Sequence, residues 1–172
     1  MNDRGAGVSR AANALNFIIP LLRKYNFNWI ITGGFASYVH GVNRPITDID
    51  IDIEISKKDK KFKKLLSDIK PFISQKLIHF VDKNYNNYNL EIDYNGQVID
   101  ICSSKELKIF NKKSGKYEQF YNLLGGFPKP KFMKFQGLKL PLLSKKLIIK
   151  NKEMLVWQRE SDFNDIKELK KL

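Results

Sequence analysis

The sequence predicts an α/β (α+β) fold in which helices flank a mixed β-sheet and two further helices close the chain. Stretches that alternate apolar and polar residues, as strands do, are interleaved with stretches that repeat apolar residues at helical spacing. The chain has 172 residues, the length of one ordinary domain, and contains no internal repeat. We therefore expect a single domain over residues 1–172.

Composition is typical of a soluble globular protein, with 42% hydrophobic and 28% charged residues. The lone cysteine, Cys102, excludes an internal disulfide, which suits a reducing compartment. No apolar run reaches the roughly 18 residues that a membrane helix needs. We expect a cytoplasmic protein without a membrane partner.

The formal net charge is +13, and an excess of this size attracts polyanions such as nucleic acid. Nearly all of the basic residues are lysines. A composition rich in lysine, asparagine and isoleucine is also typical of an AT-rich genome. Charge alone leaves both interpretations open.

The N-terminal part is expected to hold a helix, a short strand and a second helix. Residues 1–8 are polar and glycine-containing, and we expect them to be disordered. Ser9 is a suitable N-cap for the first helix, which Pro20 should kink or shorten. The apolar run 28–32 predicts a strand, and a helix over 35–40 should follow it.

The middle of the chain has the clearest strand signal. Residues 48–55 read D-I-D-I-D-I-E-I, and this alternation places isoleucines on one face of a strand and carboxylates on the other. Residues 58–69 form an amphipathic helical pattern. The Asn95-Gly96 turn predicts a β-hairpin over 88–102.

The last third is expected to be more irregular. Residues 105–124 should be helical in part, and residues 125–141, with three prolines and three glycines, should form a loop or short edge strands. Helices over about 144–157 and 161–172 make up a C-terminal helical part, residues 144–172.

Three alternating aspartates, Asp48, Asp50 and Asp52, are the first candidates for chemistry. On a strand their Cα atoms lie about 6.5–7 Å apart along one face. Neighbouring anions repel one another unless a cation neutralises them or water screens them. A pair of such carboxylates can hold Mg²⁺, with Mn²⁺ as the alternative ion. The competing interpretation is a solvated edge strand whose aspartates face water.

A calcium-binding loop is a further alternative, because Asp48, Asp50, Asp52 and Asp59 have the spacing of its first, third, fifth and twelfth positions. The sixth position of that loop requires glycine for a sharp turn, and the sequence has Ile53 there. The isoleucines favour a strand, so we do not expect a calcium loop.

Gly33 and Gly34 stand between a predicted strand and a predicted helix. Bare backbone at such a junction can approach a phosphate, and the first N–H groups of the helix are free to donate. A glycine pair alone is more typical of a tight turn. Followed closely by the acidic strand, it indicates a site that binds a triphosphate together with metal.

The run Thr32–Ile51, T-G-G-F-A-S-Y-V-H-G-V-N-R-P-I-T-D-I-D-I, resembles the signature of nucleotidyltransferases of the DNA polymerase β superfamily. It is most similar to a small Gly-Gly…Asp-Ile-Asp group that includes minimal nucleotidyltransferases and AbiEii-type toxin–antitoxin enzymes. The resemblance implies the nucleotidyltransferase fold and an enzyme of the EC 2.7.7 type. Its spacing places the metal pair at Asp48 and Asp50, with Asp50 and Asp52 as the alternative pair.

The resemblance also implies a third carboxylate on a neighbouring strand. Asp100, in V-I-D-I-C-S, is our choice for it, and Asp93 is the competitor. The stretch 147–166 resembles the closing helices of the family. Its recurring polar positions are Lys150, Arg159, Asp162 and Asp165.

The implied reaction begins with a nucleoside triphosphate whose phosphates lie over the glycine pair and bind metal held by Asp48 and Asp50. Asp100, with a second metal ion, would activate an acceptor hydroxyl, and pyrophosphate would leave. Thr32 and Ser37 are candidates for additional hydroxyl contacts to the nucleotide.

Arg44 is a candidate for phosphate contact, and its alternative role is that of a surface arginine that holds the loop in place. The acceptor hydroxyl would belong to an RNA or tRNA end or to a protein side chain. Two other functions remain open. One is a toxin–antitoxin component that acts mainly through partner binding, and the other is a non-catalytic basic module that binds nucleic acid on the same fold.

Overall fold

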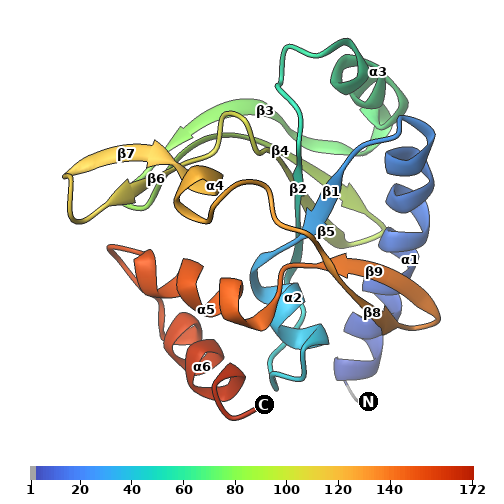
Figure 1. The fold of residues 1–172 in the computed structure, drawn as a ribbon. Helices are drawn as coiled ribbons and strands as arrows, with labels where there is room; N and C mark the ends of the chain where they lie inside the picture. The colour runs from blue at the N-terminus through green and yellow to red at the C-terminus, as the bar shows by residue number, and fades with distance from the viewer. Residues whose placement is uncertain (1–2) are drawn as a thin grey trace.

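A mixed sheet of nine strands forms the centre of the structure, a computed structural model that describes residues 3–172 (Figure 1). The strands are β1 Trp29–Ile31, β2 Asp48–Ile53, β3 Ile73–Val81, β4 Tyr85–Tyr94, β5 Gln97–Ser103, β6 Lys108–Asn111, β7 Lys116–Gln119, β8 Lys131–Phe135 and β9 Leu138–Leu142. The helices are α1 Asp3–Lys24, α2 Gly33–Val39, α3 Lys60–Asp68, α4 Phe120–Leu123, α5 Lys145–Met154 and α6 Glu160–Leu169. None of these helices is long and apolar enough to cross a bilayer.

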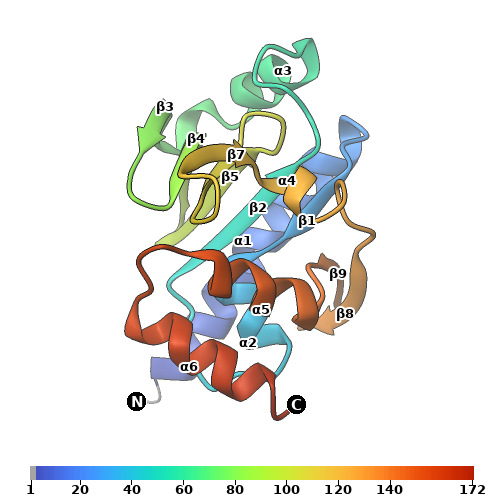
Figure 2. The same cartoon turned by 60° about the vertical axis from the view of Figure 1, so that its left-hand side comes forward.

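The strands lie in the order β7-β6-β4-β5-β2-β1-β9-β8, and β3 pairs with the outer edge of β4. β2 runs parallel to β5, β1 runs parallel to β9, and the remaining pairs are antiparallel. Helix α1 lies on one side of β1 and β2, whereas α5 and α6 lie on the other side (Figures 1 and 2). The predicted mixed sheet flanked by helices is confirmed.

The main core lies between the sheet and helices α1 and α3. Alternation along β2 and β5 turns five isoleucines to this side, and all five are fully buried. They are Ile49, Ile51, Ile53, Ile99 and Ile101. Helix α1 adds apolar residues at helical spacing, among them Leu15, Ile18 and Leu22. Because isoleucines fill this face, the aspartates of both strands face the other side.

The first helix differs from its prediction at both ends. Helix α1 already includes Asp3, so the expected helix start with an N-cap at Ser9 is wrong; Met1 and Asn2 lie outside the described residues. Pro20 does not end the helix, which continues to Lys24. Pro20 is on the exposed face, and the buried side chains around it hold the helix against the sheet.

The expectation of helix over residues 105–124 is largely wrong. This stretch forms the β6–β7 hairpin, and only the single turn of α4 is helical. β6 pairs with β4, and Gly115 has the positive φ of 68° that its turn requires. Strand β3 was not predicted, because two register shifts interrupt its alternation. The expected edge strands over residues 125–141 are present as β8 and β9.

Buried ion pairs hold the two C-terminal helices together. Lys152 Nζ of α5 lies 2.5 Å from Asp162 Oδ1 and 3.0 Å from Asp165 Oδ2 of α6. All three residues are almost completely buried. Arg44 Nη1 lies 2.5 Å from the same Asp165 oxygen, so the loop before β2 is tied to α6. These contacts fix the C-terminal helices beside α2.

Replacing Lys152 by methionine should destabilise the protein by roughly 3–5 kcal/mol, because two buried carboxylates lose their shared cation. Urea unfolding followed by circular dichroism measures the difference. Lys146→Met is the matched control, since Lys146 is exposed on the same helix, and it should change stability by less than about 1 kcal/mol. Equal stabilities of the two variants would show that the ion pairs do not hold α5 and α6 together.

Candidate active site

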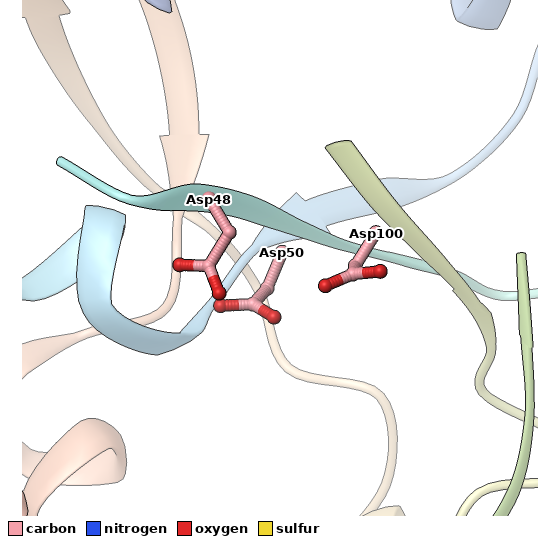
Figure 3. Close-up of side chains that lie close together, drawn as sticks. All are labelled: Asp48, Asp50 and Asp100. Atoms are coloured by element: carbon pink, nitrogen blue, oxygen red, sulfur yellow. The ribbon is translucent and has the colours of Figure 1, made fainter. Parts of the chain in front are cut away.

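Asp48, Asp50 and Asp100, here called the aspartate trio, lie together on the sheet face opposite the main core. The parallel register of β2 and β5 pairs Asp50 directly with Asp100. One carboxylate oxygen from each residue lies within 4.8 Å of the others, and the three side chains point to the same side (Figure 3). All three residues are half-buried. The residues that the sequence singled out as metal ligands are therefore close enough to share an ion.

The trio carries negative charge that its protein surroundings do not neutralise. Burial, followed by the charges of Asp48, Asp100 and Asp52, raises the pKa of Asp50 to about 7, although Lys152 acts in the opposite direction. Burial also raises the pKa of Asp100, while a hydrogen bond from Asn89 Nδ2 at 3.0 Å partly counteracts it. Hard carboxylate oxygens around uncompensated charge suit Mg²⁺ or Mn²⁺. The trio thus fits a divalent cation.

Asp52 lies on the same face of β2 but in a different environment. Its side chain is buried and accepts a hydrogen bond from the Tyr121 hydroxyl of α4. Burial raises its pKa to about 6, and the bond from Tyr121 opposes this shift. The structure therefore groups Asp48 with Asp50 and Asp100, and places Asp52 beneath α4.

Asp93, the competitor for Asp100, is next to the β4–β5 turn. It pairs with Val98 in the antiparallel register and is exposed. Its carboxylate accepts a hydrogen bond from the backbone N–H of Gly96 at 2.7 Å. This contact stabilises the hairpin turn, and Asp93 is not a member of the cluster.

The glycine pair packs directly against charged side chains of the site. Gly33 has a φ of 61°, and a Cβ atom there would lie 1.8 Å from Oδ2 of Asp50. A Cβ atom on Gly34 would lie 2.4 Å from Nη2 of Arg44. Gly33 requires glycine because its backbone is left-handed and a side chain would collide with Asp50, whereas a side chain at Gly34 would displace the Arg44 guanidinium. Helix α2 begins at Gly33, two residues before the expected start.

The other predicted nucleotide contacts have different surroundings. Thr32 is buried at the start of α2 and makes no capping hydrogen bond with its side chain. The Ser37 hydroxyl is fully buried and donates to the carbonyl of Gly33 at 3.3 Å. Arg44 is paired with Asp165, which agrees with the alternative role of an arginine that holds the loop in place. Its Nε atom is buried without a partner. Ser37 and Arg44 therefore support the loop around the glycine pair.

Several residues of the site were missed by the sequence analysis. Lys152, and not Lys150, is the buried lysine of α5; Lys150 Nζ donates to the carbonyl of Leu123 instead. Lys152 shares the apolar face of its helix with Ile148 and Leu155, and this position was the signal that could have identified it. Asn89 and Tyr121 gave no signal, since only the folded chain brings them to Asp100 and Asp52.

Arg159 faces the trio from the start of α6. Burial disfavours its charge, but the hydrogen bond to Asp162 and the charges of Asp48 and Asp50 raise its pKa overall. Arg159 Nε lies 3.3 Å from Asp162 Oδ2, and most of the side chain is exposed. The site therefore has a partly exposed cation, paired with Asp162, close to two of its three carboxylates.

Metal-free protein should lose stability through Asp50 as the pH rises from about 4 to about 7. Folding raises the pKa of Asp50, so its contribution to the free energy of unfolding is complete below the pKa that it has in the unfolded chain. This contribution is lost as the pH rises through the pKa of the folded protein. Urea midpoints in EDTA at pH 5 and pH 8 measure it. His40 changes the stability in the opposite direction, because burial lowers its pKa and its neutral form is favoured as the pH rises. The test is therefore the difference between wild type and Asp50→Asn. Wild type should lose about 2 kcal/mol more than the variant, and parallel pH profiles would contradict the assignment.

Gly33→Ala should lower the free energy of unfolding by at least about 2 kcal/mol, because a left-handed backbone and a collision with Asp50 add together. Thermal and urea unfolding measure the loss. In an Asp50→Ala background the same substitution should cost less, since the colliding oxygen is absent. Gly5→Ala, at a helical position with no neighbour within 4 Å, serves as the control and should not destabilise. An equal cost in both backgrounds would exclude the proposed contact.

No protein-family model matches the sequence, and no curated protein is similar to it in sequence. Solved structures do resemble the fold. A Thermotoga maritima protein described as a nucleotidyltransferase has a TM-score of 0.64 and 20% identity, with 81% of each chain covered. The lincosamide antibiotic adenylyltransferase LnuA, solved with lincomycin bound, has a TM-score of 0.56 and 22% identity over 91% of this chain and 94% of its own.

The antibiotic-resistance factor ANT(2″)-Ia has a TM-score of 0.55 and 14% identity, over 96% of this chain and 83% of its own. At these identities the likeness concerns the backbone arrangement. The chain has the nucleotidyltransferase fold.

Proposed function

We propose that this protein is a metal-dependent nucleotidyltransferase that transfers a nucleoside monophosphate from a nucleoside triphosphate to a hydroxyl acceptor, with release of pyrophosphate. The observation that carries the proposal is the aspartate trio, whose oxygens lie within 4.8 Å of one another beside the glycine pair. The nucleotidyltransferase fold supports it, and LnuA, which has this fold, is an adenylyltransferase.

Asp48, Asp50 and Asp100 would hold Mg²⁺ or Mn²⁺. When bound, the divalent cation would neutralise phosphate charge and lower the pKa of the acceptor hydroxyl. The uncompensated charge that raises the pKa of Asp50 is the feature of this chain that favours such an ion. Asp52 is not needed for this role, because its carboxylate is satisfied by Tyr121.

The chain itself would position the triphosphate through backbone and basic groups. Gly33 and Gly34 are half-exposed beside the trio and have no side chains, so phosphate oxygens can approach their backbone. Thr32 precedes them and would line the same surface. Arg159, drawn toward Asp48 and Asp50, would contact the phosphates from the opposite side and stabilise the leaving pyrophosphate. Ser37 and Arg44 would act indirectly by holding the loop.

Asp100 would accept the proton of the acceptor hydroxyl. That oxygen forms the new bond to the α-phosphorus, the bond from the α-phosphorus to the bridging oxygen breaks, and pyrophosphate leaves with the bonding electrons. Burial raises the pKa of Asp100, and the Asn89 amide orients its carboxylate. These two features suit a general base on the side of the trio away from the glycine pair.

Isothermal titration calorimetry with each of the four nucleoside triphosphates, with and without MgCl₂, tests the proposal. At least one should bind wild type only with magnesium. Asp48→Asn and Asp50→Asn should weaken this binding by more than about 100-fold, since each removes a negative metal ligand. Asp52→Asn should retain it within a few-fold, and Asp93→Asn is an exposed control on the same face.

Two results would remove the enzyme assignment. The first is wild-type protein that binds no triphosphate in a magnesium-dependent way. The second is full magnesium-dependent binding by Asp48→Asn and Asp50→Asn. If Asp52→Asn lost this binding and Asp48→Asn retained it, the metal-binding pair would instead be Asp50 and Asp52.

A further inference from the structure

The basic charge of the chain is absent from the strands that form the floor of the site. β2, β4 and β5 contain no lysine or arginine, although the whole chain has 31. They contain six carboxylates, which the strand registers place on one face. This acidic face consists of Asp48, Asp50, Asp52, Glu91, Asp93 and Asp100. The net charge of +13 therefore does not describe the surface that an acceptor would meet.

Strand order separates the two halves of this face. The glycine pair and α2 lie on the β1–β2 side of the trio, whereas β4 and then β3 lie beyond Asp100. With the triphosphate over the glycine pair, a hydroxyl that approaches Asp100 must come from the side of β4 and β3. The side chains on those two strands thus determine which acceptors fit.

Beyond Asp100 the surface combines acidic, amide and apolar groups. Glu91 is opposite Asp100 in the register, and its charge contributes to the raised pKa of that residue. Asn89 and Asn87 follow along β4, and the Asn87 Oδ1 atom is buried without a hydrogen-bond partner. Their partners on β3 are Ile78 and Phe80, which are 39% and 41% exposed. Directly paired residues share a face, so both apolar side chains border the amides.

Basic groups near this surface are few. Arg159 lies close to Asp48 and Asp50, where it forms an ion pair with Asp162, and the other basic groups are mostly engaged elsewhere. Lys152 is buried between Asp162 and Asp165. His79 of β3 stacks on Tyr88, which pairs with it on the opposite face.

Lys76, the remaining cation of β3, lies in the stretch where the register shifts, and within residues 3–172 it forms no ion pair with Glu91. The lysines of α3, by contrast, lie on the helix that packs with α1 beneath the other side of the sheet. A polyanionic acceptor would meet carboxylates where it needs cations.

We propose that the acceptor is a small cationic amino alcohol with an apolar part, bound over β4 and β3; this inference rests on the proposed nucleotidyl transfer. Its hydroxyl lies at Asp100, and its ammonium group lies at Glu91, where opposite charges attract. The two asparagines of β4 supply hydrogen bonds, and the apolar part covers Ile78 and Phe80. An RNA end, which net charge alone favours, does not match this surface.

Transfer of label from α-³²P-labelled triphosphates, with magnesium, tests the acceptor class. The probes are a panel of amino alcohols led by phenylalaninol, the same compounds N-acetylated, and RNA with a free 3′ hydroxyl. We expect label on amino alcohols, at least about 10-fold less on their uncharged N-acetyl forms, and none on RNA. Label on RNA, or on no amino alcohol while magnesium-dependent triphosphate binding is intact, would overturn this proposal. Absence of that binding would instead overturn the proposed function.

Variants locate the acceptor on the surface. Glu91→Gln should raise KM for the amino alcohol about 10-fold and leave triphosphate affinity unchanged, and Glu91→Asp should recover part of the loss in KM. Phe80→Ser should also raise KM. Phe132→Ser is the matched control, because Phe132 is 55% exposed on β8 at the other end of the sheet. Equal effects of Phe80→Ser and Phe132→Ser, or no effect of Glu91→Gln, would contradict the placement.

Discussion

Repulsion among carboxylates that the sheet register forces together is the constraint on which the site depends. The parallel pairing of β2 with β5 sets Asp50 opposite Asp100, and Asp48 completes the trio. The same register buries isoleucines of both strands completely on the other face. A slip by one residue would turn isoleucines to the site and aspartates into the core. The apolar face thus fixes the position of charges that would otherwise move apart, and this arrangement becomes favourable when a cation binds.

The rest of the fold brings opposite charge and bare backbone to that position. Gly33 packs against Asp50 so closely that only glycine fits, which places the start of α2 beside the trio. The C-terminal helices are held by Lys152, whose cation lies between two buried aspartates and also acts on Asp50. Arg159, at the start of α6, faces the trio from this side. The trio, the start of α2 and the C-terminal helices, which are far apart in the sequence, therefore meet at one surface. There the cations of the C-terminal helices lie close to the carboxylates of the trio.

Local signals in the sequence were sufficient for the strands that form the floor of the site and insufficient for its surroundings. The alternation over Asp48–Ile53 and the Asn95-Gly96 turn are determined by neighbouring residues, so these strands were predictable. The choice of Asp48, Asp50 and Asp100 among the aspartates depended instead on the family resemblance. Tyr121 meets Asp52 across 69 positions, and such a hydrogen bond leaves no local pattern. Strand β3 is interrupted by register shifts, and the β6–β7 hairpin is a strand pair because β4 offers a free edge. In both places tertiary pairing overrides propensity.

Charge averaged over a chain and charge at a site are different quantities, and here they have opposite signs. Lysines are concentrated away from β2, β4 and β5, where six carboxylates share a face. A divalent cation bound by the trio would neutralise the charge next to the glycine pair, but it would leave Glu91 and Asp93 unaffected. The loaded site would then be positive toward α2 and negative toward β4. A polyphosphate and an ammonium group are attracted to opposite ends of such a field, so the field itself would orient donor and acceptor with the reacting hydroxyl between them at Asp100.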